Sequence, residues 1–90
     1  MADIRLVSDS DKLEIGARTN GDLNLYHNGT NSFVENETGI LYVTNKANAN
    51  MVLGTNDTAR LTIESDGTVV TSGALQPAGN VTTGANLAVT

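Results

Sequence analysis

The stretch Gly21-Asp-Leu-Asn-Leu-Tyr-His-Asn-Gly-Thr-Asn-Ser-Phe-Val34 decides the fold class of this chain. Leu23 and Leu25 alternate with polar residues, which is the period-2 pattern of a half-buried strand. The dipeptide Asn28-Gly29 follows, and both residue types tolerate the positive φ angles of tight turns. The stretch therefore predicts a strand, a turn and a return strand.

The same pattern recurs in both directions along the chain. Turn dipeptides separate short apolar segments, and no eleven-residue window carries the apolar spacing of an amphipathic helix. We therefore expect an all-β chain of short strands joined by tight turns. The alternating apolar pairs are Leu13 and Ile15, Leu23 and Leu25, Leu41 and Val43, and Leu61 and Ile63.

Two internal periods organise these strands. Residues 13–40 align on residues 41–68 without a gap and with preserved apolar positions, which defines a 28-residue repeat. From Val69 onward, apolar residues recur every six positions. Fixed periods indicate a repeat architecture. We divide the chain into an irregular N-terminal unit (1–12), two β repeats (13–68) and a hexad-repeat β shaft segment (69–90).

Composition and charge exclude several classes of protein. Gly, Asn and Thr supply 32 of the 90 residues, which makes poor helix material. The absence of cysteine excludes disulfides and thiolate metal sites. A net charge of -5 argues against nucleic acid as a partner, and no apolar run approaches the roughly 20 residues of a membrane span. The first ten residues lack the pattern of a signal peptide.

The apolar stripe is too thin to form a core inside one chain, and short strands with one apolar face leave open edges. Identical chains wound about one axis bury the stripe against its own copies and pair those edges. We therefore predict an obligate, elongated homotrimer. The side chains expected to fill its axis are Leu13, Leu23, Leu25, Phe33, Leu41, Val43, Leu53, Leu61, Ile63, Val69, Leu75, Val81 and Leu87.

The 21–34 stretch resembles a repeat of tail fibres and other virion appendages of marine tailed bacteriophages, especially those of cyanobacteria. The shared pattern is a strand, Tyr26-His27-Asn28-Gly29, an aromatic (here Phe33) and a closing Thr38-Gly39 turn. Residues 58–69 are similar to the Arg-Leu-x-Ile-x-Ser-(Asp/Ser)-Gly unit of the same proteins. The glycine-spaced residues 67–89 resemble the shafts of phage fibres more generally.

The resemblance implies a structural virion protein: an interwoven homotrimeric β-helix or β-prism shaft of a tail fibre that supports host attachment. Its partners are then its own copies, neighbouring fibre segments or virion proteins, and a host surface receptor contacted through a tip. A stalk segment of a bacterial surface adhesin shares most of these features and is the alternative. A left-handed β-helix acyltransferase is less favoured, because one coil takes three hexads and residues 67–89 supply barely one coil.

Residues able to carry chemistry are few. His27 is the only imidazole, and three copies about a threefold axis are able to bind a metal or an anion. The other interpretation is that His27 hydrogen-bonds the Asn28-Gly29 turn. No cysteine or serine forms a catalytic motif with it, and Glu35 and Glu37 lack an aromatic sugar platform. We expect no enzymatic activity and no cofactor.

Overall fold

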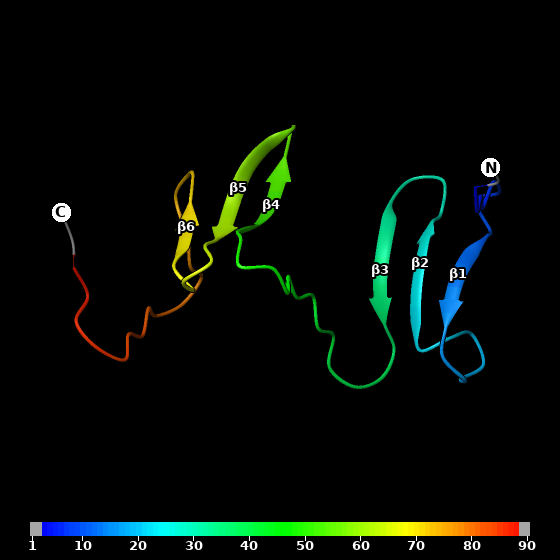
Figure 1. Ribbon diagram of the computed structural model, residues 1–90, viewed down its shortest axis with the longest axis horizontal. Coiled ribbons are helices and arrows are strands. Elements are labelled where there is room, and N and C mark those ends of the chain that lie inside the picture. The colour runs from blue at the N-terminus through cyan, green and yellow to red at the C-terminus, as the bar shows by residue number, and fades with distance from the viewer. Residues whose placement is uncertain (1–2, 89–90) are drawn as a thin grey trace. The chain divides into compact units, whose positions relative to one another are not determined.

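The described part of the chain contains six short strands joined by turns and irregular segments. The computed structural model describes residues 3–88, and these residues include no helix. The chain divides into two compact units, Met1–Val43 and Thr44–Thr90, each with one three-stranded antiparallel sheet (Figure 1). The all-β prediction is therefore confirmed. Within the described part of the chain, no helix is long and apolar enough to cross a membrane.

The first sheet is a meander of β1 (Lys12–Ile15), β2 (Leu23–His27) and β3 (Ser32–Asn36), with β2 in the centre. Leu25 lies opposite Leu13 on one side and opposite Val34 on the other. Because side chains alternate between faces along a strand, this register gathers apolar side chains on one face of the sheet. Lys12, Tyr26 and Phe33 lie on the other face.

The connection between β1 and β2 depends on two glycines. Gly16 and Gly21 have φ angles of 108° and 77°, and a Cβ on Gly21 would lie 2.5 Å from the Asn24 Oδ1. A Cβ on Gly16 would collide with the Asp22 carboxylate. That carboxylate accepts a 3.1 Å hydrogen bond from the Ala17 N–H, which fixes the loop. The loop between β1 and β2 therefore has a conformation that other residues adopt only with strain.

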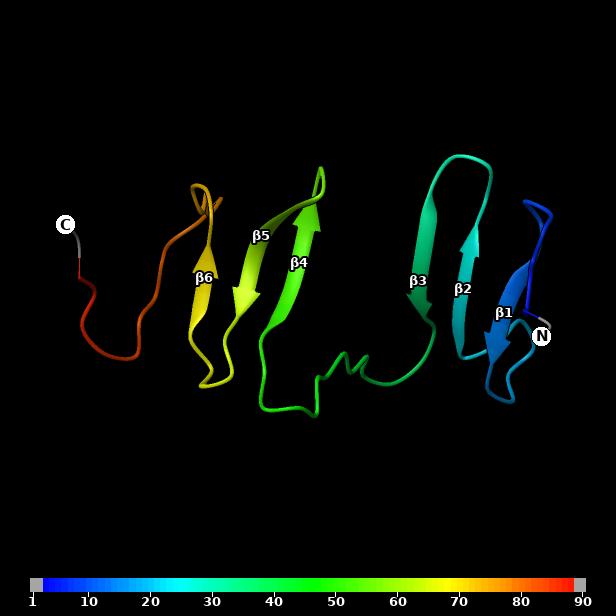
Figure 2. The same cartoon turned by 45° about the horizontal axis from the view of Figure 1, so that its top comes forward.

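The second sheet is a meander of β4 (Met51–Thr55), β5 (Thr58–Ile63) and β6 (Val69–Thr71), as Figures 1 and 2 show. Asn56 and Asp57 form its two-residue hairpin turn, with φ angles of 51° and 56°. Positive φ at both central positions is the signature of the type I′ turn, whose twist matches the flanking strands. This turn is one of those that the sequence pattern places between short apolar segments.

A bulge sets the register of the second hairpin. Gly54 lies opposite Ala59 and Leu53 opposite Leu61, so Arg60 is the extra residue of β5. In a ladder without the bulge, Arg60 would lie opposite Leu53, and the side chains of β5 beyond it would lie on the other face of the sheet. The bulge therefore brings Leu61 and Ile63 onto the same face as Leu53 and Met51.

Two predicted β segments form no strand within one chain. Residues 41–43 are irregular, although Leu41 and Val43 alternate as a strand requires, because alternation supplies no backbone partner. The strand prediction there is wrong for the single chain. The hexad segment contains only β6, and residues 72–88 form no strand. Residues 1–2 and 89–90, at the ends of two predicted segments, lie outside the described residues.

Candidate self-association surface

The two sheets form without a hydrophobic core. No hydrophobic side chain is buried in the described range 3–88, and the accessible surface of the chain is 8022 Å². Two separate globules of half this chain's 9.4 kDa mass would together expose only about 6000 Å². The excess is consistent with sheets whose apolar side chains have no second layer packed against them.

In the first sheet, one face is apolar and open. Leu13, Ile15 and Val34 are 42%, 48% and 65% exposed and share this face with Leu23 and Leu25. Cross-strand neighbours of this kind stabilise a sheet through packing, but one layer of side chains leaves its outer surface in water. This face therefore has the composition of an interface.

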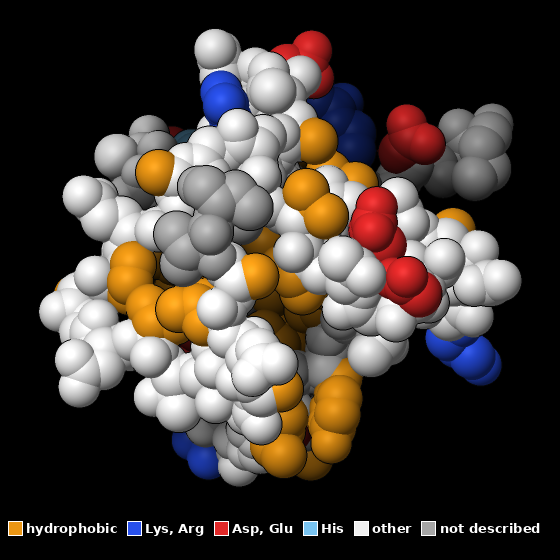
Figure 3. Space-filling model, turned by 90° about the vertical axis from the view of Figure 1, so that its left-hand side faces the viewer, with side chains coloured by type: hydrophobic (Ala, Val, Ile, Leu, Met, Phe, Trp, Pro, Cys, Tyr) orange, Lys and Arg blue, Asp and Glu red, His pale blue; other side chains and the backbone are white. Residues whose placement is uncertain are grey.

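The second sheet carries an equivalent face. Leu53 and Val69 are 56% and 60% exposed, and they share a face with Met51, Leu61 and Ile63. The space-filling view shows hydrophobic side chains reaching the surface between polar ones (Figure 3). Contiguous exposed apolar side chains of this kind mark interaction sites in soluble proteins.

The structure groups some of the predicted axis residues and separates others. Leu13, Leu23 and Leu25 share one face of the first sheet. Leu53, Leu61, Ile63 and Val69 share one face of the second sheet. Leu41, Val43, Leu75, Val81 and Leu87 are exposed and lie outside the strands. That these residues fill a trimer axis stays a prediction.

Phe33 lies apart from the leucines with which the sequence pattern grouped it. The register places it opposite Tyr26, and the two rings stack with centroids 4.8 Å apart and an interplanar angle of 19°. Val34 takes the place beside Leu25 instead. The predicted axis set omits Ile15, Val34 and Met51, although all three lie on the apolar faces. Alternation with Leu13 is enough to place Ile15 on the apolar face, whereas placing Val34 there requires the register of the β2–β3 hairpin.

The aromatic pair anchors a polar network on the opposite face of the first sheet. The Tyr26 hydroxyl donates a 3.0 Å hydrogen bond to Glu35 Oε2. The Lys12 Nζ lies 4.3 Å from the centroid of the Tyr26 ring, within range of a cation–π interaction. The hydrogen bond to Glu35, followed by partial burial and the nearby negative charge, raises the pKa of Tyr26 above its ordinary value of 10.0.

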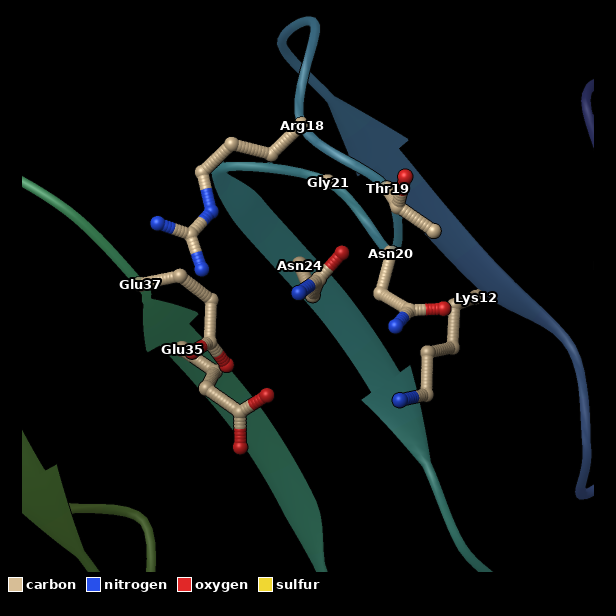
Figure 4. A pocket seen from close by; sticks show the side chains of 8 residues that line it. All are labelled: Lys12, Arg18, Thr19, Asn20, Gly21, Asn24, Glu35 and Glu37. Atoms are coloured by element: carbon tan, nitrogen blue, oxygen red, sulfur yellow. The ribbon is translucent and has the colours of Figure 1, made fainter.

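A pocket of about 250 Å³ adjoins this network, and its walls carry Lys12, Arg18, Glu35 and Glu37 around Asn24 (Figure 4). Asn24 is 1% exposed, and its Oδ1 has no hydrogen-bond partner. That oxygen is covered by the loop at Gly21, so a molecule in the pocket would not reach it. The mixed charges of the walls select no particular class of ligand.

His27 is exposed, and its Nδ1 lies 2.8 Å from the Ser32 Oγ of the opposing strand. This bond differs from the expected one to the Asn28-Gly29 turn. Within the turn, the Asn28 Oδ1 accepts the Thr30 and Asn31 N–H groups. Among the described residues of one chain, no three His, Cys, Asp or Glu side chains gather as metal ligands. The axial site at His27 involves three chains and stays a prediction.

In comparisons with known proteins, no family model, no curated protein and no solved structure matched this chain. A function is therefore inferred from the two open apolar faces and from the sequence motifs.

Proposed function

We propose that this chain is a structural segment of a homotrimeric β shaft in a tailed-bacteriophage tail fibre or related virion appendage. In this proposal three copies wind about a common axis as a β-prism or β-helix. The segment carries no chemistry of its own and supports host attachment by a tip elsewhere in the fibre. Its other partners are neighbouring fibre segments or virion proteins.

One observation carries the self-association part of the proposal. The strands form two sheets with complete antiparallel registers, yet no hydrophobic side chain is buried in residues 3–88. Burial of apolar surface is the dominant favourable contribution to folding, so a stable form of this chain needs a partner over its apolar faces. A second and a third copy supply complementary faces, and a closed ring of three has no unsatisfied end.

Two further features support an extended shaft in a virion. All four strand pairs in the described chain are antiparallel, which suits a prism of short meanders better than the parallel coils of an acyltransferase. The Tyr26-His27-Asn28-Gly29 motif, with Phe33 behind it, resembles the repeat of phage fibres. The motif favours a fibre over an adhesin stalk, which shares the remaining features.

The oligomeric state tests the proposal directly. Light scattering after gel filtration should give three times the 9.4 kDa chain mass, with an elongated frictional ratio. Leu61→Asp should abolish the trimer, because it places a charge on the apolar face beside Leu53. Thr62→Asp is the matched control on the opposite face of β5, and it should leave the trimer intact. A folded wild-type monomer would refute the proposal.

Electron microscopy separates a fibre from an adhesin. Antibodies raised against the purified trimer should label tail appendages of virions in a lysate of the source culture. Label confined to the bacterial envelope would instead favour the adhesin stalk and contradict the virion location.

A further inference from the structure

Among residues 3–88, no strand pairs with the outer edge of β4. The order of the second sheet is β4-β5-β6, so β4 uses one of its two edges and leaves the other open. Val52 and Leu53 on this strand are 52% and 56% exposed. An open edge presents a row of free backbone N–H and C=O groups, and it invites pairing with another extended segment.

Residues 41–43 have the properties of the missing segment. Leu41, Tyr42 and Val43 are 44%, 75% and 61% exposed, and they belong to no strand. Their alternating pattern predicts a strand with Leu41 and Val43 on one face. The segment is apolar, has the alternation of a strand and pairs with no strand in this chain, so it suits pairing with a strand edge of another chain.

The pair β1–β2 supplies a template for how these two elements would join. The bounds of β2 and β4 differ by 28 residues, and residues 13–15 precede β2 as residues 41–43 precede β4. In the template, Leu13 lies opposite Leu25 and Ile15 opposite Leu23. Transferred by 28 positions, the register becomes Leu41 opposite Leu53 and Val43 opposite Met51. Each of these pairs joins two apolar residues on one face.

The chain cannot make this pairing with itself through the template's loop. The positions of Gly16 and Gly21 are occupied by Thr44 and Ala49 in the 44–50 segment. Both glycines have positive φ. A Cβ at Gly16 would meet the Asp22 side chain of the loop, and one at Gly21 would meet the Asn24 side chain of β2. Neither Thr44 nor Ala49 has a positive φ, and positive φ is especially costly for a β-branched residue such as threonine. Residues 44–50 therefore do not adopt the conformation of the loop that joins β1 to β2.

We propose that residues 41–43 of one copy pair antiparallel with the open edge of β4 in a second copy, in the register Leu41–Leu53 and Val43–Met51. The partner is thus another molecule of this chain, and the strand crosses from one copy to the next. This inference rests on the self-association in the proposed function and adds the segment, the edge and the register to it.

Disulfide trapping tests the register, because the chain has no cysteine of its own. Residues opposite each other in an antiparallel pair have Cα atoms about 4.5–5.5 Å apart, which a disulfide spans. One copy with an added tag carries Leu41→Cys, and an untagged copy carries Leu53→Cys. After co-expression and mild oxidation, the mixed dimer should appear on a non-reducing gel and disappear on reduction. Val43→Cys with Met51→Cys should behave in the same way.

Tyr42→Cys with Leu53→Cys is the matched control, because the two side chains would point to opposite faces in the proposed register. It should give less than a tenth of the mixed dimer that Leu41→Cys and Leu53→Cys give. Light scattering on each variant before oxidation measures its assembly, and the yield of mixed dimer is compared between variants as a fraction of the assembled protein.

The outcomes distinguish this inference from the proposed function. An oligomer without the crosslink between the Leu41→Cys and Leu53→Cys copies, or with equal crosslinking in the control, overturns the strand pairing alone. Joining of the two positions within one chain, seen when both substitutions are placed on the same molecule, overturns it as well. A monomeric wild-type chain overturns both proposals.

Discussion

At the residue scale, a few residues determine the local structure, because other residue types would not adopt their backbone conformation or form their hydrogen bonds. Gly16 and Gly21 give the β1–β2 loop its path, and Asp22 fixes that loop through the Ala17 N–H. Asp66 holds the turn before β6 by accepting the Thr68 N–H at 2.9 Å, and this bond lowers the pKa of Asp66. Tyr26 ties β2 to β3 through Glu35. Hydrogen bonds in the turns and contacts between the strands thus hold each sheet together locally.

Substitution of Gly21 should separate steric collision from backbone strain. Gly21→Ala forces a positive φ on alanine and brings its Cβ to 2.5 Å from the Asn24 Oδ1. We expect a loss of at least about 1 kcal/mol in the free energy of unfolding, measured by urea denaturation. Gly39→Ala is the control: its φ is 78°, but its Cβ enters open space. Equal losses in the two variants would contradict the role of the close contact.

Tyr26 should titrate above the ordinary tyrosine pKa of 10.0, because its neutral hydroxyl donates to Glu35. The raised pKa means that the hydrogen bond stabilises the fold below pH 10 and is lost as the pH rises through the raised value. Absorbance titration in a Tyr42→Phe background isolates this group. Glu35→Ala should return the pKa toward 10.0, and Glu37→Ala should lower it less. An unchanged midpoint in Glu35→Ala would show that the bond is not made.

At the scale of the elements, the two hairpins solve the same pairing problem differently. The β2–β3 hairpin has a four-residue loop whose Asn28 Oδ1 accepts two backbone N–H groups. The β4–β5 hairpin has a two-residue turn and then a bulge at Arg60. Both registers place large apolar residues opposite one another, as in the pairs Leu25–Val34 and Leu53–Leu61. Side-chain pairing across the strands therefore fixes the register, and the turn adjusts to it.

The β4–β5 turn should be open to improvement. Asp57 has a φ of 56°, and Asn-Gly is the most favoured sequence for a type I′ turn. Asp57→Gly should raise the free energy of unfolding by about 0.5–1 kcal/mol and slow hydrogen exchange of the β4 and β5 amides. Asp57→Ala should lower that free energy, because alanine tolerates positive φ less well than aspartate. The turn assignment is wrong if both variants shift stability in the same direction.

At the scale of the whole molecule, the protein is a pair of single-layered sheets with open faces. A single layer leaves its apolar face in contact with water, and the described residues bury no hydrophobic side chain to compensate. In the proposed homotrimer, association supplies the free energy that a core would otherwise give, so folding and assembly are expected to be one reaction. The apolar faces are accordingly as much a requirement for stability as a surface for binding.

Stability should therefore depend on concentration. In a trimer whose chains unfold as they separate, the melting temperature rises with total chain concentration, because mass action favours the assembled state. Circular dichroism melts over a hundredfold dilution should show a shift of several degrees. Leu61→Asp, which should not form the trimer, should show no cooperative melting transition at any of these concentrations. A wild-type midpoint independent of concentration would indicate that the chain is stable alone.

Much of the fold could be predicted from the sequence, and the exceptions have physical causes. Alternation located strands at Leu13, Leu23 and Leu61, and positive-φ dipeptides located turns, because both signals are local. The placement of Phe33 could not be predicted, since it depends on a register set by both strands of a hairpin. Residues 41–43 have a strand pattern without a strand, because pairing needs a partner that the pattern does not name. Which side chains fill a trimer axis could not be predicted from local signals, because it depends on contacts between chains.

The extra residue at Arg60 has a consequence for how such a chain diversifies. Inserting or removing one residue within a hairpin exchanges the two faces of everything beyond it, while the strand sequence itself stays unaltered. A chain with repeated hairpins thereby acquires a simple means of variation. A single codon gained or lost moves a residue from one face of its sheet to the other, and the surface of that sheet changes although its strand sequences stay the same.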